Sequence, residues 1–366
     1  MTPLGWLEVV AGIIICLATF YDLFHSVVLP RPSVNRYILV RNLFGLFWAM
    51  WRWVGHRIQQ PALRETWLAT FGPMAVISMF FTWAVLFLLG YSFILDGLRT
   101  QIHPELETFG DSIYFSATTI VPLSYGDFVP IGWGARAAII FESATGVGIA
   151  ALVITLLFSL YESFQRREEL VVQLDALAGA PPSGVQLLER ASERGLRREL
   201  LKTFDDWRQW SAEVLESHLA YPILFYFRSS HDNEAWLNSF GAVMDAATLV
   251  MSTVDEDEEG AARLMFTVGF HLVEDMAWYF QYATSTNPLV DRKEFDEAVA
   301  RLKSAGYKVR PLDKAWDDFS HFRAKYALPL SHMAERLAIV PAEWIGDRSY
   351  APHADGRASR ARRRTR

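Results

Sequence analysis

The sequence predicts an all-α integral membrane protein in which apolar helices precede a helical soluble region. Three observations lead to this class. Hydrophobic residues make up 51% of the 366 residues, yet 21% are charged, so the apolar part must be segregated along the chain. Long apolar segments do gather in the first half. The alternation of apolar and polar residues that is typical of strands is nearly absent from the second half.

Three segments are long enough to cross a hydrocarbon core of about 30 Å, which needs about 20 helical residues. They are Leu4–Leu29, Trp67–Leu95 and Gly134–Phe164, and the second carries no acidic or basic side chain. Three membrane spans are therefore expected. Cys16, the only cysteine, lies in the first of them, so no intrachain disulfide can form and a packing role is expected.

Arg36–Arg57 mixes tryptophan and phenylalanine with four arginines, which favours a helix lying in the membrane interface, with a fourth span as the alternative. Arginines gather between the first two spans, and Arg166 and Arg167 follow the third. The positive-inside rule places both regions in the cytoplasm. The segment Asp96–Trp133 and the N-terminus are then outside, and the first span, which lacks the marks of a signal peptide, is expected to be retained.

Asp22 and His25 stand about one helical turn apart near the inner end of the first span. Residues at this spacing share a helix face, so the two side chains can pair with each other. The interpretation favoured here is that both lie at the membrane surface and extend into water.

The stretch Ser116–Pro130, SATTIVPLSYGDFVP, lies between the second and third spans and resembles a potassium-channel pore loop. Anchored on Tyr125-Gly126-Asp127, the family pattern Thr-Val-Gly-Tyr-Gly-Asp falls without gaps on Pro122, Leu123, Ser124, Tyr125, Gly126 and Asp127. The resemblance implies a selectivity filter in which backbone carbonyls from four copies of the loop replace the hydration shell of an ion.

A pore helix is expected before this loop, re-entrant at membrane depth. Thr108 with Asp111 three positions later is typical of a helix start, and the helix would run through Thr118 and Thr119 into the loop. The negative end of its dipole would face a cation.

Two positions depart from the family pattern. Ser124 replaces a glycine that allows positive φ without steric cost, and Pro122 replaces a threonine whose hydroxyl forms the innermost ion site. A potassium-selective pore, a weakly selective cation pore and a loop that no longer conducts therefore all stay open.

The third span carries further candidates. Gly146 and Gly148 follow Glu142 by about one turn; they are expected either to act as a gating hinge, as a mid-span glycine does in this family, or to allow close helix packing. Glu142, an ionisable group inside a span, is expected to attract cations from the cavity or to hydrogen-bond behind the filter. Asp127 would concentrate cations, anchor the filter to the pore helix, or serve as a plain turn residue.

Most of the chain is similar to bacterial proteins that join a two-helix potassium-channel pore to a helical cytoplasmic region. The segments YDLFHSVVLPRP, LYESFQRREE, LDALAGAPPS, WRQWSAEVLESHLAYP and YFRSSHDNEAW extend the resemblance beyond the loop. It implies an extra helix before the pore and a location in the bacterial inner membrane. The expected organisation is 1–66, membrane helix plus interfacial helix; 67–164, pore domain; 165–184, inner-helix extension and linker; 185–350, helical cytoplasmic domain; and 351–366, basic disordered tail.

The soluble region is expected to hold helices over Val185–Glu193, Leu196–His218, Asn233–Val254, Ala261–Thr284 and Arg292–Ala305. Its metal-ligand-type residues form a weak pattern, with His271 and Glu274 at i, i+3 on one helix face, as in di-iron bundles. Capping, core packing and surface charge explain these residues better, so no metal or cofactor is expected.

Two charge runs remain. The run at 255–259, Asp-Glu-Asp-Glu-Glu, is expected to be a solvated turn, with calcium sensing as the alternative. The arginine-rich tail from Arg357 to Arg366 is expected to contact anionic lipid, with the acidic turn and nucleic acid as alternatives. A net charge of -6 argues against a nucleic-acid-binding protein.

The functional hypothesis is a homotetrameric cation channel, with K⁺ as the first candidate for the conducted ion, membrane lipid as its surroundings and no enzymatic activity. Its opening is expected to be set by the cytoplasmic helices, which would pull on a helical extension of the third span from Phe158 to Glu169. A single pore loop cannot enclose an axis, which is why a tetramer is expected. A non-conducting membrane sensor or scaffold that keeps the channel fold is the alternative. A membrane-bound metal enzyme using His271 and Glu274 is the third hypothesis.

Overall fold

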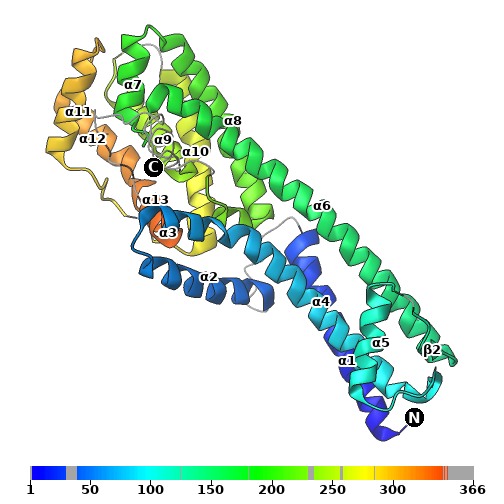
Figure 1. Cartoon of the computed structure of the whole chain (residues 1–366). Coiled ribbons are helices and arrows are strands. Elements are labelled where there is room, and N and C mark those ends of the chain that lie inside the picture. Colours follow the sequence, from blue (N-terminus) through cyan, green and yellow to red (C-terminus); the bar gives the residue numbers. More distant parts are fainter. Residues whose placement is uncertain are drawn as a thin grey trace, which may run out of the picture. The chain divides into compact units, whose positions relative to one another are not determined.

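The computed structural model describes residues 2–29, 39–123, 125–179, 181–229, 235–255, 259–283, 285–340, 342 and 344. The chain divides into two compact units. The first comprises Met1–Ser163 with Leu219–Phe227, and the second comprises Phe164–His218 with Arg228–Arg366. Both are built from helices, as Figure 1 shows, so the predicted all-α class is confirmed.

The first unit holds the membrane helices and a small two-stranded sheet. Its elements are α1 (Pro3–Leu23), the π-helical turn η1 (Phe24–Val28), α2 (Leu39–Arg57), α3 (Pro61–Ala69), α4 (Phe71–Gly97), the 3-10 turn η2 (Arg99–Gln101), β1 (Ile102–His103), α5 (Phe109–Ile120), β2 (Val129–Pro130), the first part of α6 (Trp133–Ala178) and the 3-10 turn η3 (Pro222–Tyr226).

Three helical segments among the described residues are long and apolar enough to cross a membrane: Pro3–Val27, Pro61–Gly97 and Trp133–Ala178. They correspond to the three expected spans. Helix α2 is not among them. Two reciprocal hydrogen bonds join it to α3. The Trp51 indole N–H donates to the Trp67 carbonyl at 3.0 Å, and the Trp67 indole N–H donates to the Trp51 carbonyl at 3.1 Å. The interfacial position of α2 remains a prediction.

Helix α1 packs directly on α4 through small residues. A Cβ added to Gly12 would lie 2.3 Å from the Gly90 carbonyl oxygen, and one added to Gly90 would lie 2.6 Å from the Cys16 sulfur. About two turns further along, a Cβ on Gly97 would meet the Gly5 carbonyl at 2.4 Å. Backbones that approach this closely gain van der Waals contact in lipid. The expected packing role of Cys16 is confirmed.

Asp22 lies inside the same helix pair, and the expectation that it extends into water is wrong. Its side chain is buried, with 5% of the residue exposed, and it accepts a hydrogen bond of 2.8 Å from the Trp83 indole. The donor comes from α4, 61 residues away, which is why the local sequence did not reveal it. The His25 ring contacts its own helix instead, through Nδ1 and the Tyr21 carbonyl at 3.0 Å.

The described residues of the second unit form the end of α6 and seven further helices, with α9 lying against α7, α10 and α12. They are α7 (Gly184–Glu193), α8 (Arg197–Ala220, whose last two residues belong to the first unit), α9 (Trp236–Ser252), α10 (Glu259–Phe280), α11 (Arg292–Ser304), α12 (Leu312–Ala324) and α13 (Ala327–Arg336). The five helices expected here are confirmed to within a few residues. Helices α12 and α13 were not anticipated.

Helix α6 is continuous from Trp133 to Ala178, so the extension of the third span is longer than the sequence indicated. The residue after its last one is Gly179, which has a φ of +86°, a conformation that glycine adopts without strain. The expected linker then leads to α7, which begins at Gly184. The predicted tail at 351–366 lies outside the described residues, as do Arg31, Arg36, His231, Asp232 and residues 256–258.

Candidate pore site

Helix α5 has the start that the sequence predicted. The Asp111 amide donates to Thr108 Oγ1 at 3.2 Å and the Thr108 amide donates to Asp111 Oδ2 at 2.8 Å, which completes a capping box. The helix ends at Ile120. Thr118 and Thr119 lie in its last turn, and both hydroxyls donate to the Phe115 carbonyl, at 3.0 and 2.8 Å. These two hydroxyls therefore form hydrogen bonds within α5.

Two serines fasten α5 to α4. Ser112 donates to Asp96 Oδ1 at 2.8 Å, and Asp96 also pairs with Arg99 at 2.5 Å. One turn later, Ser116 contacts the Leu88 carbonyl at 3.1 Å. Both serines are fully buried. Because buried polar groups are costly without partners, these contacts orient α5 along α4.

Glu142 connects α5 to α6. Its residue exposure is 0%, and its Oε1 accepts a hydrogen bond from the Ser116 hydroxyl. Its Oε2 is buried without a partner among the residues that the structure describes. Of the two roles expected for Glu142, hydrogen bonding behind the loop fits this geometry. A carboxylate facing a water-filled cavity does not, because the side chain is enclosed by its own chain.

The two glycines of α6 differ. A Cβ on Gly146 would lie 2.0 Å from the Ile120 carbonyl oxygen, so α6 touches the end of α5 at this point. Ser143 adds a contact of 3.4 Å to the Thr119 carbonyl. Gly148 has no atom within 4 Å of such a Cβ. Close packing is thus the role that the structure gives Gly146, whereas the hinge remains a prediction.

The loop after α5 lies at the surface of its unit. Leu123 donates its amide to the Thr118 carbonyl at 2.9 Å, which begins the turn. Pro122, Leu123, Tyr125, Gly126 and Asp127 are exposed, Tyr125 by 67%. Gly126 has a φ of +81°, a conformation that favours glycine. Ser124 lies outside the described residues.

Asp127 contacts the pore helix through a residue that the sequence reasoning missed. The Tyr114 hydroxyl on α5 lies close enough to the Asp127 side chain to interact with it electrostatically. The next residue, Phe128, packs its ring 6.3 Å from Tyr114 and 5.7 Å from Phe115. The aromatic residues of α5 were the one feature of the sequence that could have predicted this contact. Anchoring to the pore helix, one of the roles expected for Asp127, fits this arrangement.

A two-stranded sheet joins the two ends of the segment that contains α5 and the loop. Strands β1 and β2 pair antiparallel, with Ile102 opposite Pro130 and His103 opposite Val129. The Gln101 carbonyl accepts from Ile131 at 2.8 Å, and its side-chain oxygen accepts from Ala135 at 3.2 Å, at the start of α6. The C-terminal end of the loop is therefore held by the segment that follows α4.

The arrangement is a short helix and an exposed loop suspended between two long apolar helices. Residues 74–163, which span most of α4, all of α5 and the loop, and the membrane part of α6, match a family model described as ion channel. Residues 74–163 form an ion-channel domain. Comparison with curated proteins and with solved structures finds no match. Together with the three apolar helices, the match at residues 74–163 indicates a membrane protein that carries an ion-channel domain.

The metal-site alternative gains no support from the second unit. His271 and Glu274 are both exposed on α10. Within the described part of the chain, no group of three or more histidine, cysteine, aspartate or glutamate side chains is placed to hold a metal ion. His231 and Asp232, two further residues of metal-ligand type, lie outside that part.

Proposed function

We propose that this ion-channel protein is a homotetrameric cation channel whose filter is the backbone of residues 122–127. The observation that carries the proposal is the way in which α5 and its loop are held. Ser112 and Ser116 attach α5 to α4, and Glu142 attaches α5 to α6. The Phe128 ring packs against Tyr114 and Phe115, which holds the loop beside α5. A rigid support for an exposed loop suits backbone carbonyls that must keep a fixed spacing around an ion.

The tetramer is supported by what each chain leaves uncovered. The loop is exposed, and α6 bears exposed apolar side chains at Val147, Ile154 and Phe158, by 58, 56 and 74%. Their spacing of seven and four residues places them on one helix face. Four such faces around an axis would line the inner vestibule of a pore, and four loops would complete the oxygen ring.

Pro122 and Ser124 make the filter a degenerate version of the potassium-channel pattern. Pro122 lacks the hydroxyl of the family threonine, so the innermost ion site would lose four side-chain oxygens. A cation channel with K⁺ permeability and reduced discrimination against Na⁺ follows. The double variant Pro122→Thr with Ser124→Gly is expected to raise the K⁺ over Na⁺ permeability ratio at least tenfold, which corresponds to about 1.4 kcal/mol of discrimination.

Orientation in the bacterial inner membrane follows from loop charge. Arginines flank the α2 and α3 region and follow the third span, which supports a cytoplasmic second unit and an outer two-stranded sheet. The arginine-rich tail would then lie on the cytoplasmic side, near anionic lipid headgroups.

Gating by the second unit is supported by the continuity of α6 and by the way in which its extension is held. Arg167 is 1% exposed, pairs with Glu168 at 2.9 Å and contacts His218 Nε2 at 3.2 Å. The Trp210 indole also donates to the Arg167 carbonyl at 2.9 Å. His218 and Trp210 belong to α8. A movement of α8 would therefore displace the part of α6 around Arg167, and α6 continues from there to the pore.

The departures at Pro122 and Ser124 also favour a second candidate function, a non-conducting sensor or scaffold that retains the channel fold. Liposomes containing the purified full chain distinguish the two. The channel predicts K⁺ or Na⁺ flux above that of empty liposomes. The scaffold predicts no cation flux from the natural sequence together with flux from the Pro122→Thr, Ser124→Gly variant.

A further inference from the structure

The second unit contains a cavity of about 320 Å³, at the small end of the range for ligand sites in proteins. All of its walls belong to this unit. The start of α7 and residues along α9 and α13 line it, together with Leu289 and with Trp344 near the end of the described chain. The Ser183 hydroxyl donates to the Trp344 carbonyl at 2.8 Å, so the α7 start and the C-terminal segment are joined beside the cavity.

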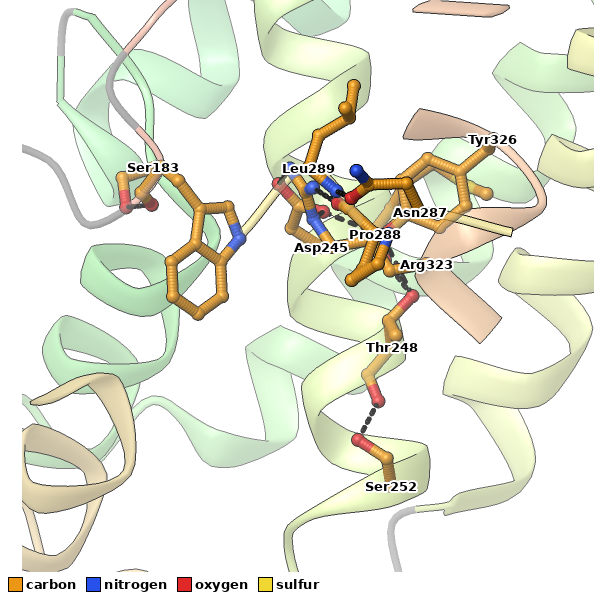
Figure 2. A network of polar contacts seen from close by, with 11 residues as sticks. Ser183, Asp245, Thr248, Ser252, Asn287, Pro288, Leu289, Arg323 and Tyr326 are labelled. Carbon is orange, nitrogen blue, oxygen red and sulfur yellow. Dashed lines mark hydrogen bonds and ion pairs between the residues drawn. The ribbon is translucent and has the colours of Figure 1, made fainter. Parts of the chain in front are cut away.

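Asp245, Arg323 and Tyr326 form the polar part of the wall, as Figure 2 shows. Arg323 Nε donates to Asp245 Oδ1 at 3.0 Å, and Tyr326 donates to the same oxygen at 2.6 Å. Asp245 Oδ2 receives a single long contact of 3.5 Å from Arg323 Nη2. Oδ2 therefore keeps most of its capacity to accept a hydrogen bond from a ligand.

Arg323 keeps donors as well. Its Nη1 donates to the Pro288 carbonyl, which is presented by a turn in which Asn287 Oδ1 accepts from the Leu289 amide at 2.8 Å. A guanidinium has five N–H groups. The contacts to Asp245 and Pro288 use three of them, counted over the residues that the structure describes, and two are left for a ligand.

The remaining wall combines one more charge with apolar surface. Glu294 is exposed at the rim, and its Oε2 accepts from the Asp291 amide at 3.2 Å. Leu237, Leu330 and Ala334 supply apolar surface. The cavity thus presents two carboxylates, one guanidinium and an apolar side. A simple anion would meet the two carboxylates, and a simple cation would meet the guanidinium.

We propose that this cavity binds a small zwitterion with the chemistry of a free α-amino acid that has an apolar side chain. The ligand carboxylate would accept from the two uncommitted N–H groups of Arg323, a charge-assisted contact. The ligand ammonium would donate to Asp245 Oδ2 and Glu294. The ligand side chain would lie against Leu237 and Leu330. This assignment gives each charged group of the wall an opposite charge on the ligand.

Ligand binding would also act on the pore, and this consequence alone rests on the proposed channel function. Ser183 and Gly184 line the cavity and follow the end of α6 after a linker of a few residues. A ligand that orders this wall would restrict the end of α6. The cavity is then the place where a chemical stimulus reaches the gate.

The test is calorimetric titration of the purified full chain in detergent with valine, leucine, isoleucine, methionine and phenylalanine. At least one of the five is expected to bind. The amide of the bound amino acid, which lacks the negative charge, and the matching carboxylic acid without the amino group are each expected to bind at least tenfold more weakly. Absence of binding by all five, or equal binding of the amide or the acid, overturns the proposal.

Two variants locate the site, each with a matched control. A Cβ on Gly241 meets only Leu330 Cδ1, at 3.9 Å, and Gly241 lines the cavity, so the Gly241→Leu side chain should occupy the cavity and abolish binding. Glu294→Gln keeps the helix cap and should weaken binding at least fivefold. The controls are Gly260→Leu, at a glycine in open space, and Glu297→Gln, at an exposed acid outside the cavity. Binding that survives Gly241→Leu places the ligand elsewhere and rejects this site.

A liposome flux assay with and without the bound amino acid keeps this proposal separate from the channel proposal. Binding without cation flux under any condition would leave the ligand site standing and remove the channel. Flux without binding of any of the five amino acids would leave the channel proposal standing and remove the ligand site.

Discussion

Buried carboxylates are partnered differently in the two units. In the membrane unit, Asp22 accepts from the Trp83 indole and Glu142 accepts from the Ser116 hydroxyl. In the second unit, Asp245 is bonded by Arg323, and Glu189 forms a two-point pair with Arg301. Charge is expensive in a hydrocarbon environment, so neutral donors suit Asp22 and Glu142 within the membrane helices, whereas a guanidinium with its fixed fork suits the second unit. Asp96, at the end of α4, has both kinds of partner, because Ser112 and Arg99 donate to it.

The difference indicates which acid-to-amide substitutions each unit can tolerate. A carboxylate held by a neutral donor can be replaced by an amide with little loss, because the acceptor oxygen survives. A carboxylate held by a buried guanidinium cannot, because the replacement leaves an unpaired charge.

The largest expected effect is that of Asp245→Asn. Arg323, whose side chain is only 12% exposed, would lose its counter-charge, at a cost of about 3–5 kcal/mol. The midpoint of thermal unfolding of the second unit should fall by roughly 10 °C. Arg292 pairs with Asp313 on the surface, and Asp313→Asn is the control, with a cost below about 1 kcal/mol. Equal effects of the two variants would contradict the distinction between buried and exposed pairs.

The next effect concerns helix contacts in the membrane unit. Gly12→Leu would drive a side chain into the Gly90 backbone and separate α1 from α4, at a cost of about 1–3 kcal/mol. Gly45→Leu, at a glycine with no atom within 4 Å, is the matched control and should be tolerated. Proteolysis in detergent measures the loss of α1 packing. If both variants resist digestion like the natural protein, α1 does not depend on this contact.

A smaller effect is expected from pH. Burial and the neighbouring Arg167 charge lower the pKa of His218 well below its usual value of about 6.5. The folded chain therefore keeps His218 neutral where the unfolded chain binds a proton, so stability is present above about pH 6.5 and is lost as the pH falls below it. The unfolding midpoint should drop on acidification from pH 7.5 to 5.5, and it should drop less in His218→Gln. Exposed His271→Gln should retain the full drop; equal behaviour of the two variants would remove His218 as the cause.

The smallest expected effect is that of Glu142→Gln, the membrane counterpart of Asp245→Asn. The amide oxygen can still accept from Ser116, so the cost should stay below about 1 kcal/mol and cation flux should persist. Unfolding midpoints and flux of the two acid-to-amide variants, measured side by side, provide the check. A loss comparable to that of Asp245→Asn would mean that the Glu142 charge itself has a partner.

Sequence reasoning succeeded where the signal was local. The helix cap at Thr108, the glycine at 179 and the apolar spans depend on neighbours within a few residues. It failed where a partner came from another helix. Asp22 meets Trp83 and Glu142 meets Ser116 only after α1, α4, α5 and α6 have packed. The Asp245 network depends in the same way on Arg323 and Tyr326, which lie about 80 residues away on segments that were not predicted as helical.

The central claim is that the loop after α5 conducts cations. Reversal potentials of the purified protein in planar bilayers, with K⁺ on one side and Na⁺ on the other, test it most directly. The account predicts a cation current whose reversal potential is shifted toward that of K⁺, and a larger shift in the Pro122→Thr, Ser124→Gly variant. An anion-selective current, or no current from either protein while both remain folded tetramers, would contradict it.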